Sequence, residues 1–360
     1  MLVYLSVMFL CCILLYAMRN DDNKKRPLAI AFGLIWLMIS LQDGWGGDHD
    51  AYVMFFDQLK GMSFRDLLAD DTHGEIGYKI VMSLMPSAHF GMVVGIGVWC
   101  FAMAFFFYHF VPQKWWFFAI LFVFLDKAIM MGMVASFLRM AIANTFLIFA
   151  VYNIWNRKRW MAALLIGLGS LFHLSVLFFL PIIFVGQGKN RIQLPVVLGI
   201  FAGITIFFMI SPSSWFDLVE TVITGSDAFE QYEYYLENQD AVQFKGVTLL
   251  IVFYWVYLLA KITNQSKLEG KEYLMMYLAL IRIAFDLLPA VGLSTRFFYF
   301  IDIYFFAGMM TVLNRLPQKD YVNKAAVIAT LLLMFWFTGF RVYARSEFFL
   351  LHWATYNPIF

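Results

Sequence analysis

Long apolar runs alternate with short polar segments along most of the 360-residue chain. Within a run the apolar residues are nearly continuous, and a helix needs about 20 of them to cross a bilayer. The pattern therefore predicts membrane-spanning helices. They are expected over residues 1–18, 27–42, 91–111, 115–133, 136–155, 192–211, 246–262, 273–291, 294–312 and 324–340.

Two stretches do not fit one simple crossing each. Residues 75–90 contain three charged or polar side chains around Pro86, so we expect a re-entrant or surface helix there. Residues 160–185 are too long for one crossing and too short for two, and they carry two glycines and His173 near the middle. This pattern predicts two half-helices that turn near one surface, where protein or water must cover the break.

The composition supports the same class of protein. The chain is 62% hydrophobic with a mean hydropathy of +0.74, which is too apolar for a soluble core of this size. We expect an all-α polytopic membrane protein with about ten full transmembrane helices plus half-helix and re-entrant segments. Residues 1–360 should form a single transmembrane domain, with loops 43–75 and 212–245 as an extracytoplasmic cap.

The charges of the loops predict how the chain crosses the membrane. Of the 26 Lys and Arg residues, 16 fall in loops on one side of the predicted threading and six in loops on the other. Most of the acidic residues fall in loops on the side that holds fewer Lys and Arg residues. Because cytoplasmic loops carry the excess of Lys and Arg, the basic side is expected to lie inside.

Four basic residues fall within apolar spans, and the threading places all of them in the outer leaflet. They are Lys127, Arg139, Arg282 and Arg296. Charges in a bilayer are costly, so such a group predicts an anion site. Lys127 follows an aspartate and could snorkel outward, while Asp286 lies one helical turn from Arg282 and could pair with it. Arg139 and Arg296 have no nearby acid in sequence, which favours phosphate binding.

The loop over residues 42–75 holds the other concentration of polar side chains. Its glycines allow close approach of the backbone to a ligand, although Asp48 could serve only as a helix cap. Asp48 and Asp50 could hold a divalent cation against a diphosphate, but two carboxylates are a weak metal signal, and we expect no cofactor. His173 fits either a satisfied polar residue at a helix break or a functional group.

Five motifs, in this order and spacing, resemble the EpsG family of membrane proteins, which are Wzy-type polysaccharide polymerases. They are G-x-D-x-x-x-Y-x-x-x-F (Gly46, Asp48, Tyr52, Phe56), E-x-G-Y (Glu75, Gly77, Tyr78), R-x-x-I-A (Arg139, Ile142, Ala143), H-x-S (His173, Ser175) and R-x-x-Y-F (Arg296, Tyr299, Phe300). Two positions depart from the family pattern: Gln42 replaces a usual Arg, and Met140 replaces a usual Gln.

The resemblance implies a GT-C-like helix arrangement and a site that faces outward. It also implies a reaction in which a growing glycan on undecaprenyl diphosphate is transferred to a sugar hydroxyl of another lipid-linked repeat unit. This would occur at the outer face of the bacterial plasma membrane. Besides these substrates and membrane lipid, a chain-length regulator and a flippase are candidate partners, whereas nucleic acid is not expected.

The candidate site residues can be assigned to the roles that such a reaction requires. Guanidinium groups match phosphate oxygens and can stabilise the leaving diphosphate, while the acceptor hydroxyl needs a base or an orienting acceptor. The assignments are His173, Glu75 and Asp48 for catalysis, Arg139, Arg282, Arg296 and Lys127 for the diphosphate, and Asp50, Tyr52, Tyr78 and Tyr299 for the sugar.

Other activities are open alternatives. A flippase or exporter of lipid-linked glycans would need polar groups through the midplane or repeated halves, and the sequence shows neither. An O-antigen ligase or a polyprenyl-phosphate-dependent glycosyltransferase would need similar outer cations, so the sequence does not separate these activities from polymerisation.

Overall fold

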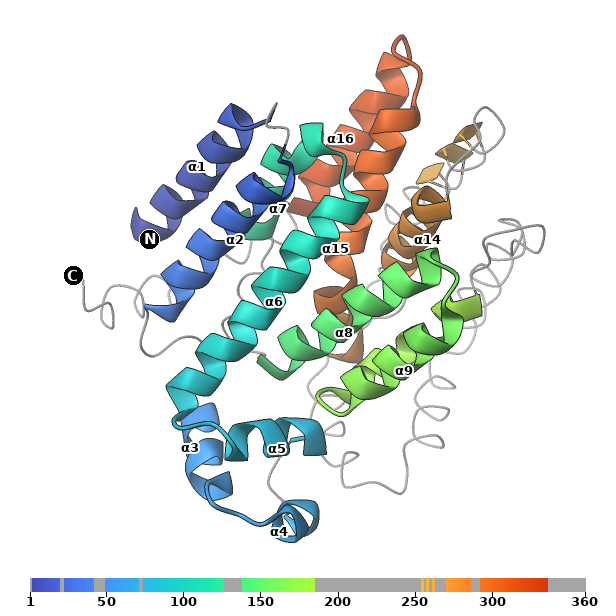
Figure 1. Cartoon of the computed structure of the whole chain (residues 1–360). Helices are drawn as coiled ribbons and strands as arrows, with labels where there is room; N and C mark the ends of the chain where they lie inside the picture. The colour runs from blue at the N-terminus through green and yellow to red at the C-terminus, as the bar shows by residue number, and fades with distance from the viewer. Residues whose placement is uncertain are drawn as a thin grey trace. The chain divides into compact units, whose positions relative to one another are not determined.

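The computed structural model describes residues 2–19, 23–41, 49–70, 74–125, 138–184, 254–255, 257–258, 261–262, 270–285 and 292–335. Every regular element in these ranges is a helix (Figure 1), which confirms the prediction of an all-α protein. The chain divides into two compact units, which are described separately. The first comprises Met1–Phe184 and Ile328–Phe360, and the second Val185–Val327.

The first unit is built mainly from apolar helices, with three shorter helices, α3, α4 and α5, grouped at one end of α6 (Figure 1). Its helices include α1 (Leu2–Ala17), α2 (Lys25–Ser40), α3 (His49–Leu59), α4 (Phe64–Ala69), α5 (Ile76–Ser83), α6 (Ala88–Phe110), α7 (Trp116–Leu125), α8 (Leu138–Trp155) and α9 (Arg159–Ser170), with 3₁₀ helices η1 (Gln113–Trp115) and η3 (Leu174–Phe184).

Helices α2 and α6 pack in opposite directions. The Trp36 indole N–H donates to the Val93 carbonyl over 2.9 Å near the end of α2 and the start of α6. Earlier in α2, Phe32 meets Phe107 edge-on with ring centroids 5.3 Å apart, near the end of α6. The start of α2 therefore lies beside the end of α6.

Helices α6 and α8 run in the same direction. A Cβ on Gly95 would lie 2.7 Å from the Leu138 side chain, so glycine permits the first residue of α8 to approach α6 about two turns from the start of α6. Towards their ends, Phe110 packs on Trp155 with ring centroids 5.7 Å apart. The starts of α6 and α8 therefore share one end of this unit.

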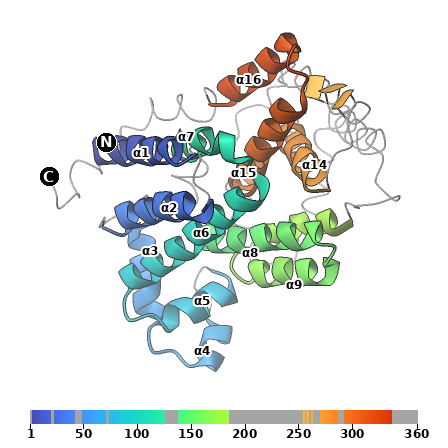
Figure 2. The ribbon, with the colours of Figure 1, turned by 45° about the horizontal axis from the view of Figure 1, so that its top comes forward.

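Helix α9 returns along α8 and brings residues 171–173 to the same end, and Figure 2 shows α8 and α9 side by side. Close packing fixes this return, because a Cβ on Gly169 would lie 3.1 Å from the Phe146 side chain. The predicted interruption of 160–185 is present as a turn between α9 and η3. Its second half is 3₁₀ and includes Pro181.

The boundary between α5 and α6 differs from the expected helix over 75–90. Helix α5 ends at Ser83, and α6 already begins at Ala88 because the Ser87 hydroxyl accepts the Phe90 N–H over 3.1 Å as an N-cap. Lys79, too polar for a lipid-facing position, is buried and pairs with Asp70 at 3.1 Å. The break at Pro86 thus separates a short helix from a long one.

Two helices in the described ranges are long and apolar enough to cross a membrane, Ala88–Phe110 and Leu138–Trp155. Other apolar helices there, including α7 and α9, are shorter. The predicted number of about ten spans therefore stays a prediction, as do the single transmembrane domain and the extracytoplasmic cap. The span at 192–211 and the loop at 212–245 fall outside the ranges that the structure covers.

The second unit contains α14 (Gly270–Phe285), α15 (Gly292–Arg315) and the first part of α16 (Tyr321–Phe335). Helices α14 and α15 touch closely, since a Cβ on Gly308 would lie 2.5 Å from the Ala279 Cβ. Arg315 binds both carboxylate oxygens of Glu272, each over 2.7 Å. This bidentate pair fixes the end of α15 beside the start of α14.

Candidate functional site

The start of α5 is bonded to the turn between α9 and η3. The Gly77 N–H donates to the Leu171 carbonyl over 2.8 Å, and the Leu174 N–H donates to Glu75 Oε1 over 3.1 Å. A Cβ at Gly77 would lie 2.6 Å from the Leu171 oxygen, so only glycine fits without displacement. These contacts hold Glu75 against the turn that carries His173.

Arg139 reaches the same point from the first turn of α8. Its Nη1 donates to Glu75 Oε2 over 2.8 Å, so one carboxylate joins α8 and the 171–174 turn. The Arg139 side chain is 17% exposed and the Glu75 side chain 24% exposed, so the ion pair is accessible at its edge. Such a partly exposed pair can exchange contacts with an arriving polar ligand.

Two tyrosines surround the guanidinium of Arg139. The guanidinium carbon lies 5.9 Å from the centroid of the Tyr78 ring, and the guanidinium also donates a side-chain hydrogen bond to Tyr52. The two rings lie 5.7 Å apart, and both tyrosines are buried. Burial raises the pKa of Tyr78 well above its usual range, so its hydroxyl stays protonated and neutral.

His173 is buried in the turn beside these groups. The Ser175 N–H donates to His173 Nδ1 over 3.3 Å, so the neutral ring in this arrangement carries its proton on Nε2. The ring can then donate a hydrogen bond through Nε2. The His and Ser of the H-x-S motif are thereby linked by a physical contact.

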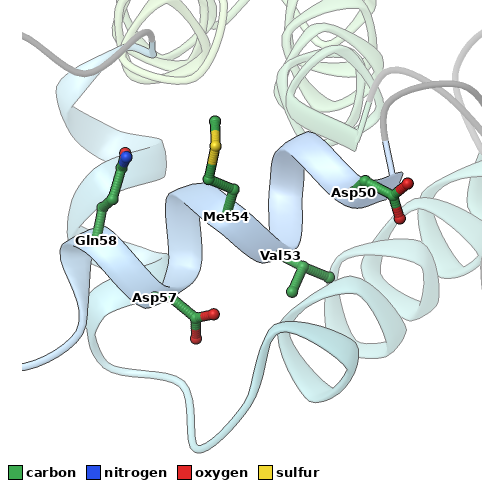
Figure 3. A pocket seen from close by; sticks show the side chains of 5 residues that line it. All are labelled: Asp50, Val53, Met54, Asp57 and Gln58. Carbon is green, nitrogen blue, oxygen red and sulfur yellow. The ribbon is translucent and has the colours of Figure 1, made fainter.

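Asp50 lies in the first turn of α3, two residues before Tyr52. Figure 3 shows it at one end of a shallow hollow of about 480 Å³. The hollow runs along one face of α3, and both polar and apolar side chains line it. The other lining residues are Val53, Met54, Asp57 and Gln58.

Arg282 belongs to the second unit, where it forms an ion pair with Asp302 across α14 and α15. Both residues are almost fully buried, with 1% and 2% exposure. The sequence suggested Asp286, one turn away, as a partner; Asp286 is not among the described residues. Sequence reasoning did not identify Asp302 as the partner, although its position deep in an apolar helix could have indicated a paired charge.

The structure thus brings together Glu75, Arg139, Tyr52, Tyr78 and the turn of His173 in the first unit. The contact between Glu75 and Arg139, 64 positions apart, was not predicted from the sequence. Asp48 and Lys127 fall in the gaps of the described ranges, and the side chains of Arg296 and Tyr299 are likewise not described. Their assigned roles, and that of Arg282, stay predictions.

The described residues form helices, two of them long and apolar, and a charged site lies where α5, α8 and the α9–η3 turn meet, which are features of a helical membrane protein. Comparison with protein-family models identifies the family: the EpsG model matches residues 25–353, which include all five motifs, and the chain belongs to the EpsG family. It is therefore a polysaccharide polymerase-like membrane protein. The searches of curated proteins and of solved structures found no match.

Proposed function

We propose that the protein polymerises oligosaccharide repeat units carried on undecaprenyl diphosphate. The growing glycan is transferred to a sugar hydroxyl of another lipid-linked unit at the outer face of the bacterial plasma membrane. The observation that carries this proposal is the Glu75–Arg139 pair, held by the turn that contains His173. It combines an anion-binding group with a proton acceptor on packed helices, as the reaction requires.

The reaction breaks the bond between the anomeric carbon and the diphosphate oxygen and forms a bond to the acceptor oxygen. Negative charge therefore develops on the leaving diphosphate, and the acceptor hydroxyl loses a proton. Arg139 has five N–H donors in its guanidinium, so it can bind phosphate oxygens while it holds Glu75. Stabilising that charge is its proposed task.

The contacts of His173 and Glu75 suggest different tasks for these residues. With Nδ1 accepting the Ser175 N–H, His173 Nε2 is a donor, which suits a diphosphate oxygen better than an acceptor hydroxyl. Glu75 accepts one bond on each oxygen, and a carboxylate has about four lone-pair sites. We assign the acceptor proton to Glu75 and a leaving-group contact to His173.

The assignment is tested with purified protein and lipid-linked repeat units, with polymer ladders resolved on gels. Glu75→Gln keeps an acceptor oxygen but removes the base, and the polymerisation rate should fall by about 10²-fold or more. Arg139→Gln should lower the rate by about 10²-fold through loss of charge stabilisation. Arg65→Gln, at an exposed arginine in α4, is the matched control and should leave the rate unchanged.

The assignment fails if Glu75→Gln and Arg139→Gln, folded as judged by helix content, polymerise at the wild-type rate. A uniform loss in all three variants, Arg65→Gln included, would also count against it. That pattern would indicate a general effect of removing charge.

A further inference from the structure

An apolar groove of about 660 Å³ runs between α2 and α6 in the first unit. Its floor includes Phe32, and two glycines widen it: Gly33, where a Cβ would meet nothing within 4 Å, and Gly97. Phe101 and Trp36 on its walls are 65% and 40% exposed, so the groove opens outward from the helix pair.

The groove has one charged end. Lys25 lines the groove at this end, with its ammonium 5.6 Å from the centroid of the Tyr108 ring, and His109 also lines this end. Lys24 and Arg26 flank Lys25 in sequence and are exposed. The other end, around Trp36 and Gly97, is apolar. This polarity matches a lipid with an anionic head.

The length of the groove also matches a lipid. Its lining on α6 runs from Gly97 to His109, which spans about 18 Å at 1.5 Å per residue. That is close to half of a hydrocarbon core about 30 Å thick, the depth of one leaflet. A single acyl chain therefore fits along it, with the lipid phosphate at the level of Lys25.

The lipid at this groove differs from the glycan-carrying substrate. Leu138, next to Arg139, packs on Gly95, whereas His109 at the Lys25 end of the groove lies 14 residues further along α6, about 21 Å away. A diphosphate bound at Arg139 cannot also reach Lys25. We propose that the groove binds an acyl chain of an anionic phospholipid from the leaflet opposite the Glu75–Arg139 pair, with its phosphate at Lys25.

Trp36 provides a local readout, because brominated acyl chains quench indole fluorescence on contact. The protein is placed in phosphatidylcholine nanodiscs with a minority of phosphatidylglycerol, and the bromines are carried on one lipid or the other. The Trp36 signal is the difference between wild type and Trp36→Phe. Brominated phosphatidylglycerol should quench it more than its mole fraction predicts.

Three variants test the parts of the proposal. Lys25→Gln should lower quenching by phosphatidylglycerol to its mole-fraction value. Gly33→Leu should fill the groove and abolish Trp36 quenching by either lipid. Gly167→Leu, at another helical glycine with nothing within 4 Å of a Cβ, is the matched control and should quench like wild type.

The proposal is overturned if quenching in the wild type follows the mole fraction of the brominated lipid, or if Gly33→Leu quenches like wild type. Absence of any quenching of Trp36 would also overturn it, because another segment or a protein partner would then cover the groove. Enhanced quenching by a brominated polyprenyl phosphate, with none by phosphatidylglycerol, would transfer the site to the substrate lipid.

Discussion

Glu75 links elements that lie far apart in the sequence. Its Oε2 accepts from Arg139 on α8, and its Oε1 accepts from the Leu174 N–H next to His173. One carboxylate at the start of α5 therefore joins α5 to both α8 and the turn of His173. Gly77 makes this geometry accessible by letting the α5 backbone touch Leu171. The E-x-G-Y motif therefore has a structural reason for each of its first two defined positions.

Gly77→Ala should separate the proposed site without removing any of its functional groups. The new Cβ would lie 2.6 Å from the Leu171 oxygen, and the resulting strain should cost about 1–3 kcal/mol of unfolding free energy. We expect a reduced polymerisation rate with helix content unchanged, measured by ladder formation and circular dichroism. Gly167→Ala, at an open position, should keep the full rate. Equal rates for the two variants would contradict the tight docking of α5.

The Arg282–Asp302 pair is a second feature at the residue scale. Removing one partner leaves a buried charge without its counterion, so Arg282→Met should cost about 3–5 kcal/mol of unfolding free energy, measured by denaturant titration in detergent. The double variant with Asp302→Leu should recover most of that loss. If the double variant is as unstable as Arg282→Met, the pair does not act as a structural unit.

At the scale of elements, the apolar runs predict which segments are helical, because long apolar segments in a membrane satisfy their backbone only as helices. Their ends are less predictable. The start of α6 depends on the Ser87 cap, which moves Ala88–Phe90 from the expected preceding segment into the long helix. The break between α9 and η3 was predicted from its glycines and His173, since apolar periodicity is interrupted there.

The Ser87 cap itself can be tested. Ser87→Ala removes the acceptor of the Phe90 N–H and should lower the unfolding free energy by about 1 kcal/mol. Ser83→Ala is the control, because the Ser83 hydroxyl bonds back to the Ile80 carbonyl within α5 and caps no helix start. Denaturant titration of both variants measures the difference, and equal stabilities would show that Ser87 does not fix this boundary.

The candidate site was only partly predictable for a related reason. Motif order and charge placement selected Glu75, Arg139 and His173 separately, and the packing of α5, α8 and α9 then brings their backbone positions to one end of the first unit. Contacts between segments 64 and 99 positions apart depend on helix direction and register, which one sequence does not specify. The buried partner of Arg282 was missed because Asp302 lies 20 positions away on the next helix.

At the scale of the whole molecule, the two proposals assign two lipid contacts to one chain: a substrate diphosphate at Arg139 and a phospholipid at Lys25. These positions are about 21 Å apart along α6, so each should respond to its own variants. Lys25→Gln should therefore change phospholipid selectivity, and Arg139→Gln should change polymerisation. A loss of both properties in either variant would indicate a common structural defect.

All of the proposed residue roles depend on polymerisation of lipid-linked repeat units by the purified protein. The direct measurement is incubation of the wild-type protein in nanodiscs with repeat units on undecaprenyl diphosphate, followed by analysis of glycan length and of released undecaprenyl diphosphate. We expect a ladder of products, with one undecaprenyl diphosphate released for each unit joined. A single addition without a ladder, or transbilayer movement without release of the lipid diphosphate, would contradict it.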